Sequence, residues 1–500
     1  NVITDDGTVI FPKEPTTVKI TATLSRNEVN MTKEFEFVVQ PNEIINPSII
    51  YQTALQDVSF VNDSYYKGLM KTNLDYMMSL DKDRLLYNYR RIAGLSTQGA
   101  QSYGAWISPE SNGAGQFEAH YVVALAKASV TMPDYRSSTG ESVLDRLTYM
   151  VKELQKCQQA YAEKDPANKG YLGGFSTENF DALEEGRNIL SDGTSVWVPW
   201  YFNHKTLEAL LDVHTYAASE ELRVIAKEML FDLADWSYNR MSSISADTRA
   251  KVLQREYGGM GEVLFQIYGI SKDVRYYTAA KYFEETTFLQ NTYKNVDLLT
   301  GLHANTTIPK FLAAAAAYEV TNDEFYKTVC INGFEMIMKR TYANGSTSID
   351  EFWRQENVTD TGNGTAETCC SYNMIKLSDY LYRWTNDVKY ADYIENVYTN
   401  HILASMAPDT GLKTYLTNTA FGYYKVFHTP DTAFWCCACT GMESFAKLPN
   451  GIYYVKDNNV TANMYYPTTI KVAKTPAIKE TIEDPQLFDF FDLTSNRGHL

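Results

Sequence analysis

Two short cysteine-rich segments are the first feature of this sequence that could do chemistry. Residues 365–372 read TAETCCSY and residues 434–440 read FWCCACT, so most of the 7 cysteines fall into two tight groups far apart along the chain. Two such segments are a usual source of the four ligands of a zinc site, and Glu367 adds a carboxylate oxygen beside Cys369. Thiolates favour Zn²⁺ over Mg²⁺ or Ca²⁺. The sequence therefore predicts a zinc site.

Two other interpretations of the cysteines stay open at this point. A disulfide between the two segments is compatible with a secreted protein, and a bound zinc ion could be purely structural. An odd total of 7 cysteines leaves at least one thiol unpaired in any disulfide scheme, which favours a metal site or catalysis. Cys157 and Cys330 lie in helical patterns, and we expect them to be isolated buried thiols.

A pair of glutamates could add acid–base chemistry to the same region. Glu351 is followed by a loop rich in Gly, Asn and Thr that leads to Glu367, and such a loop can bring both carboxylates to one pocket. One carboxylate could bind the metal. The other, beside Phe352 and Trp353, is expected to have a pKa raised by its apolar surroundings and to serve as a general acid.

Three histidines with polar or aromatic neighbours could reach a substrate. His120 lies in FEAHY, His204 in WYFNHK and His303 in GLHANT. A hydrogen-bonded core histidine is the ordinary interpretation of each one. If the three instead begin the inner helices of a helical barrel, they line one cup and can bind substrate hydroxyls.

Several common catalytic motifs are absent from the sequence. It contains no GxSxG, HExxH or P-loop motif, and the glycines of residues 256–261 do not follow a strand as a dinucleotide fingerprint requires. The sequence therefore gives no support for a serine hydrolase, a zincin or a nucleotide-binding enzyme.

Amphipathic helices joined by loops make up most of the chain and must position these residues. Apolar residues recur at helical spacing in about a dozen segments. They are residues 66–80, 117–129, 143–162, 204–217, 220–240, 259–269, 273–288, 307–319, 322–340, 370–385, 387–405 and 441–448. Successive helical hairpins without βαβ alternation predict a mainly α fold, a toroid of helix pairs, rather than a Rossmann or TIM fold.

Strand-like alternation of apolar and polar residues marks both ends of the chain. It runs through residues 1 to about 40 and returns in residues 452–455 and 460–466. We therefore expect three domains: a β-domain over residues 1–42, a helical domain over 43–451, and a second β-domain over 452–500 that is too short for a full sandwich. The sequence begins at Asn1 without a signal-peptide pattern, as expected of a fragment or a processed chain.

Composition excludes several classes of protein. With 44% hydrophobic residues and a mean hydropathy of -0.33, the chain is neither disordered nor collagen-like, and no apolar run is long enough to span a membrane. The net charge of -16 and the lack of a basic cluster argue against a nucleic-acid partner. The 37 tyrosines and 7 tryptophans supply flat rings with hydrogen-bonding tips, which suit sugars as ligands.

Eight motifs in order resemble glycoside hydrolase family 127, the β-L-arabinofuranosidases, over about residues 50 to 466. Written from their first residues, they are Leu86-YNYRRIAGL, Tyr103-GAWISP, Phe117-EAHY, Trp200-YFNHK, Glu256-YGGM, Gly301-LHANTTIPK, Glu367-TCCSYNMIKL and Phe434-WCCACTGME. Membership of a family does not fix the sugar.

The resemblance implies a fold, a metal and roles for particular residues. It implies an (α/α)6 barrel flanked by β-sandwich domains and one zinc ion, with the nucleophile of a retaining mechanism among the zinc-bound cysteines. The matching residues are Glu367, Cys369, Cys436 and Cys437 as metal ligands, Cys436 as nucleophile, Glu351 as general acid/base, and His120, His204, His303, Glu395 and Tyr415 in the sugar subsite. Residues 1–42 resemble a bacterial immunoglobulin-like module.

Two cysteines depart from the family pattern. Cys370 stands where relatives commonly have Asn or another residue, and Cys439 stands where many have Gly. The nucleophile is therefore Cys436 or Cys439, with Cys436 preferred because the Cys436–Cys437 doublet is the shared element. The role of Cys370 stays open.

We expect an extracellular or cell-surface bacterial exo-glycosidase that removes terminal β-L-arabinofuranosyl residues from plant-type glycans by retaining hydrolysis. The expected partner is a carbohydrate, with no nucleic acid and no membrane span, and the location is inferred from the immunoglobulin-like module. Two alternatives remain: a glycosidase of the same fold for another rare sugar, whose pocket around Trp106, Trp353 and Tyr415 differs in shape, or a non-catalytic carbohydrate-binding or scaffold protein.

Overall fold

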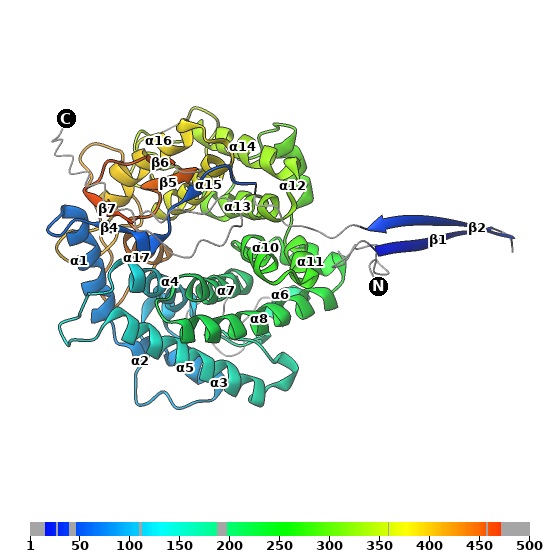
Figure 1. Ribbon diagram of the computed structural model, residues 1–500. Coiled ribbons are helices and arrows are strands. Elements are labelled where there is room, and N and C mark those ends of the chain that lie inside the picture. The colour runs from blue at the N-terminus through cyan, green and yellow to red at the C-terminus, as the bar shows by residue number, and fades with distance from the viewer. Residues whose placement is uncertain are drawn as a thin grey trace, which may run out of the picture.

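The computed structural model describes residues 16–26, 29–39, 47–109, 113–187, 198–358, 360–456 and 459–471. Within them, helices dominate, and apart from one long hairpin of two strands the strands are short (Figure 1). Among the described residues, no helix is both long and apolar enough to cross a membrane.

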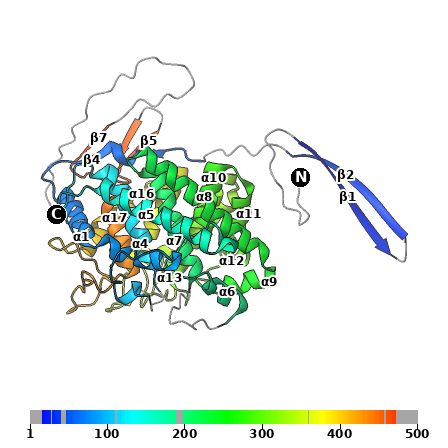
Figure 2. The same ribbon diagram turned by 90° about the horizontal axis from the view of Figure 1, so that it is seen from below.

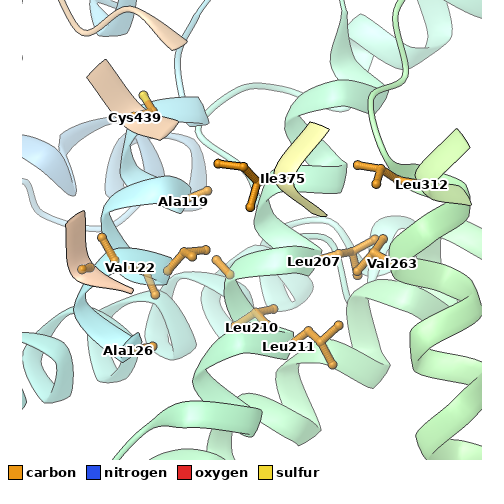
Figure 3. Packing of buried hydrophobic residues seen from close by; sticks show 14 of the residues in the cluster. Ala119, Val122, Ala126, Leu207, Leu210, Leu211, Val263, Leu312, Ile375 and Cys439 are labelled. Atoms are coloured by element: carbon orange, nitrogen blue, oxygen red, sulfur yellow. The ribbon is translucent and has the colours of Figure 1, made fainter. Parts of the chain in front are cut away.

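Six helices form a closed inner ring. They are α4 (Gln116–Thr131), α7 (Pro199–Tyr216), α10 (Met260–Ser271), α13 (Ala304–Thr321), α15 (Thr368–Thr385) and α17 (Cys436–Ala446). Each packs against the next in this order, and α17 packs against α4 to close the ring. Figure 3 shows buried side chains from all six, among them Val122 of α4, Leu312 of α13 and Cys439 of α17.

Each inner helix has an outer partner. The outer helices are α5 (Val143–Lys164), α8 (Glu220–Ser243), α11 (Val274–Tyr282), α14 (Glu324–Met338), α16 (Val388–Val397) and α1 (Tyr65–Ser79). They pack on α4, α7, α10, α13, α15 and α17 respectively, so the first outer helix of the chain covers the last inner one. The fold is an (α/α)6 barrel, as expected.

The two layers differ in how their residues are buried. Nearly every side chain of α4 is buried, whereas α5 buries one face that includes Leu147, Met150 and Leu154. An amphipathic stripe of this kind is the pattern of a helix with one face toward the core and the other toward water. Ser142 caps the start of α5 by accepting a hydrogen bond from the Asp145 backbone N–H.

Short helices between the main pairs were not expected from the sequence, because they are too brief to show a period. They are α2 (Lys82–Leu85), α3 (Tyr87–Ala93), α6 (Glu178–Glu185), α9 (Ala246–Val252) and α12 (Thr286–Tyr293), with 3₁₀ turns at Leu55–Asp57, Ala105–Ile107, Pro166–Asn168 and Leu403–Ser405. The helix expected over residues 387–405 instead ends at Val397 and continues as a π turn, Tyr398–Ile402.

Two small sheets combine strands from opposite ends of the barrel segment. One has the order β3 (Tyr51–Gln52), β5 (Tyr453–Lys456), β6 (Asn459–Ala462), and the other pairs β4 (Val58–Phe60) with β7 (Thr468–Ile470). Figure 2 shows β4, β5 and β7 gathered at one edge of the helical body. The boundary expected at residue 452 therefore does not separate these sheets from the segment that opens the barrel.

The two expected β-domains lie largely outside the described residues. Within residues 1–42, the structure describes one antiparallel hairpin, β1 (Thr16–Arg26) with β2 (Val29–Val39). An immunoglobulin-like module is neither confirmed nor contradicted by this hairpin. Residues 472–500, the remainder of the second expected β-domain, are outside the description.

Candidate active site

A cavity of about 690 Å³ opens at the end of the barrel where all six inner helices begin. Each inner helix, or the turn just before it, contributes to the lining: Gln116 for α4, Tyr201 for α7, Glu256 for α10, His303 for α13, Glu367 for α15 and Cys436 for α17. Because the N-terminal end of a helix carries unpaired N–H groups and a partial positive charge, this end of the barrel favours anionic side chains.

Four potential metal ligands come together on one side of this cavity. Ligand atoms of Glu367, Cys369, Cys436 and Cys437 all lie within 4.8 Å of one another, and all four residues are buried. The Sγ atoms of Cys369 and Cys437 are 3.1 Å apart, and all three cysteines are free thiols. The structure thus brings together the four ligands expected from the sequence, without the disulfide that was the alternative.

Two helix N-termini hold this cluster. Glu367 is the residue that precedes α15, with Cys369 in the first turn, and Cys436 and Cys437 are the first two residues of α17. Helix dipoles at these positions stabilise thiolates and carboxylates. Hydrogen bonds from the thiols of Cys369 and Cys437 also hold the pKa of Cys436 well below its ordinary value.

The other members of the cluster respond differently to burial. Burial raises the pKa of Cys369 and Cys437 well above the ordinary value, and burial together with the charge of Cys436 raises the pKa of Glu367 to about 8. Acidic groups packed this closely and this deeply cannot all lose their protons without a compensating cation. The donor set of three thiols and one carboxylate suits zinc, and it could hold a metal ion.

Glu351 lies on the same cavity and is held in an unusual backbone conformation. Its φ is 69°, and its carbonyl accepts a 2.8 Å hydrogen bond from the Ala304 N–H at the start of α13. Its carboxylate accepts a hydrogen bond from the Tyr415 hydroxyl and lies 3.8 Å from His303 Nε2. The fold therefore fixes the position of this carboxylate through both its backbone and its side chain.

The pKa of Glu351 departs from its ordinary value in the direction opposite to the one expected. The interaction with the His303 imidazole, together with the hydrogen bond from Tyr415, outweighs burial and lowers this pKa. The apolar surroundings were also misassigned. Trp353 is buried away from the cavity with its Nε1–H donating to Thr347 Oγ1 at 2.9 Å, and Phe352 lines the cavity instead. Burial raises the pKa of the other carboxyl, that of Glu367.

Tyr415 connects the acid to the thiol. Besides donating to Glu351, its hydroxyl oxygen lies 3.6 Å from the Sγ atom of Cys436. Burial raises the pKa of this phenol, and the neighbouring thiols reinforce the effect, so the hydroxyl keeps its proton and stays a hydrogen-bond donor. Cys436, Tyr415 and Glu351 thus form one continuous part of the cavity wall.

Residues 58–450 match the family described as the beta-L-arabinofuranosidase, GH127 catalytic domain. The chain belongs to this family. GH127 is a family of glycoside hydrolases, and the match spans the whole helical barrel. A search of the curated proteins finds no match.

Solved structures share the fold of this GH127 chain. A GH127 β-arabinofuranosidase aligns with a TM-score of 0.62 at 14% identity, over 86% of this chain and 66% of its own. A GH127 β-L-arabinofuranosidase from Geobacillus stearothermophilus T6 aligns with a TM-score of 0.58 at 15% identity, over 83% and 68%. This chain therefore spans about two thirds of the length of these relatives. At such identities the likeness shows the fold alone.

Only one of the three histidines expected in the sugar subsite of this GH127 chain lines the cavity. His303 does, and its Nδ1 accepts from the Thr306 N–H at 3.3 Å. His120 is buried behind the wall, hydrogen-bonded to Glu443, and His204 is buried with its Nδ1 accepting from the Gly259 N–H at 3.1 Å. His120 and His204 therefore do not line this cavity, and their place in the sugar subsite stays a prediction.

Glu395 is not brought to the cavity. It lies on the outer helix α16, and its charge acts on Tyr66 and Tyr466, two rings stacked 4.4 Å apart. An outer helix contacts its inner partner rather than the barrel mouth, so the expected subsite role does not fit this position. Tyr415, by contrast, does line the cavity.

The two additional cysteines have separate surroundings. Cys439 is fully buried in the hydrophobic core, with its thiol 3.2 Å from the Trp435 carbonyl oxygen, and it does not belong to the ligand cluster (Figure 3). Cys370 is also buried and donates to Glu367 Oε2 at 3.4 Å. The Cys370 thiol therefore helps to hold the carboxylate of Glu367 in place, whereas Cys439 lies in the core, away from the cavity.

Several cavity residues had no role in the sequence analysis. They include Gln116, Tyr201, Gln254, Arg255, Glu256, Asn305 and Thr306. Glu256 stands out among them, because burial raises its pKa to about 7. One signal could have identified it: it begins a family motif directly before a predicted inner helix, the same position that Glu367 has before α15.

Proposed function

We propose that this protein is a retaining exo-glycosidase that hydrolyses terminal β-L-arabinofuranosyl residues of plant-type glycans. The observation that carries the proposal is the joint placement of Cys436, Tyr415 and Glu351 on one cavity, in a chain of the GH127 family. A retaining mechanism needs a nucleophile and an acid/base group that face the same anomeric carbon. The location we propose is outside the cell or on its surface.

Cys436 is the proposed nucleophile. Its sulfur forms a bond to the anomeric carbon as the bond from that carbon to the glycosidic oxygen breaks, and Glu351 gives its proton to the leaving oxygen. In the second step Glu351 takes a proton from water, the water oxygen bonds to the anomeric carbon, and the sulfur leaves with its electron pair. Tyr415 is placed to donate to whichever of its two neighbours carries negative charge.

Glu351 must hold a proton at the moment the glycosidic bond breaks. In the free protein His303 and Tyr415 both favour its charged form. A substrate oxygen that replaces one of these partners removes part of that stabilisation and raises the pKa of Glu351. Binding of the sugar therefore favours the protonated form of Glu351 that the first step requires.

The cofactor we propose is a zinc ion held by Glu367, Cys369, Cys436 and Cys437. When bound, it keeps the coordinating thiols deprotonated at neutral pH and lowers their basicity. The protein itself supplies the helix N-termini that hold these ligands, and the Cys370 thiol that fixes one oxygen of Glu367.

The lining of the cavity suits a sugar. Polar groups, among them Gln116, Asn305 and Thr306, can reach hydroxyls, while Trp106 and Phe352 offer partly exposed rings. A concave site with a few convergent polar groups among aromatic rings is the usual form of a small-molecule site, and a volume of about 690 Å³ lies within the usual range.

The test is hydrolysis of 4-nitrophenyl β-L-arabinofuranoside by protein purified without chelator. We expect turnover with retention of anomeric configuration, and at least a ~100-fold loss in Glu351→Gln. Glu356→Gln is the matched control. Glu356 is an exposed carboxylate in the loop between Glu351 and Glu367, and this variant should keep full activity. If the protein hydrolyses another aryl glycoside but not the arabinofuranoside, the proposed sugar is wrong and the proposed reaction class stands. Glycan binding without any turnover would favour a carbohydrate-binding protein.

A further inference from the structure

The turn before α10 places one more carboxyl group on the cavity wall. Glu256 lines the cavity, and the next three residues are Tyr257, Gly258 and Gly259. The Gly259 N–H donates to His204 Nδ1 at 3.1 Å, and the Tyr257 hydroxyl donates to Glu285 Oε1 at 2.8 Å. Both bonds anchor the turn to buried or partly buried groups outside the cavity.

The packing of this turn leaves it little freedom. Gly258 has φ +56°, and a Cβ at this position would lie 2.7 Å from the Tyr201 ring and 2.8 Å from His204 Nδ1. A Cβ on Gly259 would lie 2.7 Å from His204 Nε2. The imidazole of His204 therefore sits directly under the turn. The turn that carries Glu256 therefore has little room to move.

Glu256 is also joined to the catalytic side of the cavity by a chain of contacts. The side chain of Thr306 lowers the pKa of Glu256 in part, and Thr306 Oγ1 lies 3.1 Å from His303 Nδ1. On the other side of the same imidazole, Nε2 faces Glu351. Glu256 and Glu351 therefore lie on the same cavity, related through Thr306 and His303.

The mechanism proposed above does not use Glu256. Among the residues that the structure describes, no ion pair joins it to a lysine or an arginine, so its charge is not neutralised as a structural carboxylate's usually is. Burial raises its pKa to about 7, while the charge of His303 opposes this effect and that of Cys436 reinforces it. A neutral carboxyl can both donate and accept a hydrogen bond, which matches a sugar hydroxyl.

We propose that Glu256 is a further substrate-binding residue, whose carboxyl hydrogen-bonds one hydroxyl of the sugar bound in the cavity. This inference rests on the proposed glycosidase function and adds a determinant of its specificity. A buried polar group left without its partner is costly, so a site built around one hydroxyl rejects sugars that lack it. The substrate class is therefore a sugar that carries a free hydroxyl at the position facing α10.

Deoxy substrates test this assignment. The activities compared are those of the wild type, Glu256→Gln and Glu256→Ala on 4-nitrophenyl β-L-arabinofuranoside and its 2-deoxy, 3-deoxy and 5-deoxy analogues. We expect the wild type to lose ~10- to 100-fold in kcat/KM on one analogue, as for a hydrogen bond to a buried acidic group. Glu256→Ala should lose a similar factor on the parent sugar and discriminate against that analogue less than about threefold.

Two controls separate recognition from structure. Glu228→Gln, at an exposed position of α8, should discriminate among the four substrates as the wild type does. Glu256→Gln keeps the shape of the side chain, so thermal unfolding near that of the wild type shows that its losses do not come from a disturbed turn. The proposal is overturned if Glu256→Ala still discriminates as the wild type does, or if it loses activity evenly on all four substrates.

Failure of the proposed function gives a different result. If the wild type hydrolyses none of the arabinofuranosides, the function is wrong, and Glu256 is judged by calorimetric binding of a panel of free pentoses and hexoses. At least ~10-fold weaker binding of a bound sugar by Glu256→Ala supports the assignment. Equal binding by both proteins, or no binding of any sugar by the wild type, overturns it.

Discussion

The Sγ atom of Cys436 lies 3.6 Å from the hydroxyl oxygen of Tyr415. That hydroxyl also donates to Glu351, so one phenol touches both groups that are proposed to react with the anomeric centre. A donor placed between a nucleophile and an acid can follow the negative charge from one to the other during the reaction without any movement of the backbone.

Replacing Tyr415 with Phe should lower kcat by ~100-fold while changing KM little, because the lost donor acts on charge that develops in the reaction. The pH profile should change as well. The Tyr415 hydroxyl lowers the pKa of Glu351, so the Tyr415→Phe substitution should raise that pKa. Glu351 would then stay protonated to higher pH, and the loss of activity on the alkaline side of the profile should move to higher pH. Steady-state kinetics between pH 4 and 9 measure both effects. Tyr423→Phe, at an exposed ring, is the control.

Cys436→Ser should abolish measurable turnover, because a serine hydroxyl is far less acidic and less nucleophilic than a thiol. Cys439→Ala should keep most of the activity and destabilise the fold by ~1 kcal/mol, since it only leaves a small void in the core. Rates on the aryl substrate and thermal melts distinguish the two variants. The opposite pattern of activities would move the nucleophile to Cys439.

Elemental analysis of protein purified without chelator should give about one zinc per chain, with the clustered thiols reduced. Cys369→Ser and Glu367→Gln should each bind less zinc, whereas Cys157→Ser, whose thiol is buried outside the cluster, should bind as much as the wild type. Chelation should lower the melting temperature, because a ligand that binds only the folded state stabilises it. Absence of zinc together with thiols lost in pairs would contradict the metal site.

Gly258→Ala should destabilise the protein more than Gly140→Ala does. Both glycines have positive φ, so both substitutions cost ~1 kcal/mol of backbone strain. A Cβ at position 140 meets nothing within 4 Å, whereas one at position 258 collides with Tyr201 and His204. The difference in unfolding free energy therefore isolates the crowding under the turn. Equal losses would mean that the turn can move away from His204.

The sequence predicted the inner and outer helices of the barrel well, because each has enough residues for an apolar period to show. It could not predict which side of a helix faces the cavity. His120, His204 and His303 look alike in the sequence, yet only His303 lines the cavity, since His303 immediately precedes α13 whereas the other two lie inside their helices and are buried.

The two cysteine-rich segments indicated a zinc site, and the resemblance to the family then identified Glu367, Cys369, Cys436 and Cys437 as its ligands. Glu395 was misplaced for a different reason: position relative to a family motif does not distinguish an outer helix from an inner one. The lowered pKa of Glu351 depends on His303, a contact between distant parts of the chain that no local pattern reveals. The pairing of β3 with β5 was missed for the same reason.

The two small sheets join segments that the whole barrel separates along the chain. Tyr51 pairs with Val455 and Phe60 with Thr468, beside the contact of α1 with α17. Since β3 and β4 precede α1 and β5 and β7 follow α17, these strands act as a clasp that ties the segment before the first outer helix to the segment after the last inner one. Loss of either strand segment should therefore loosen α17, and with it two of the four metal-ligand candidates, although the clasp itself touches none of them.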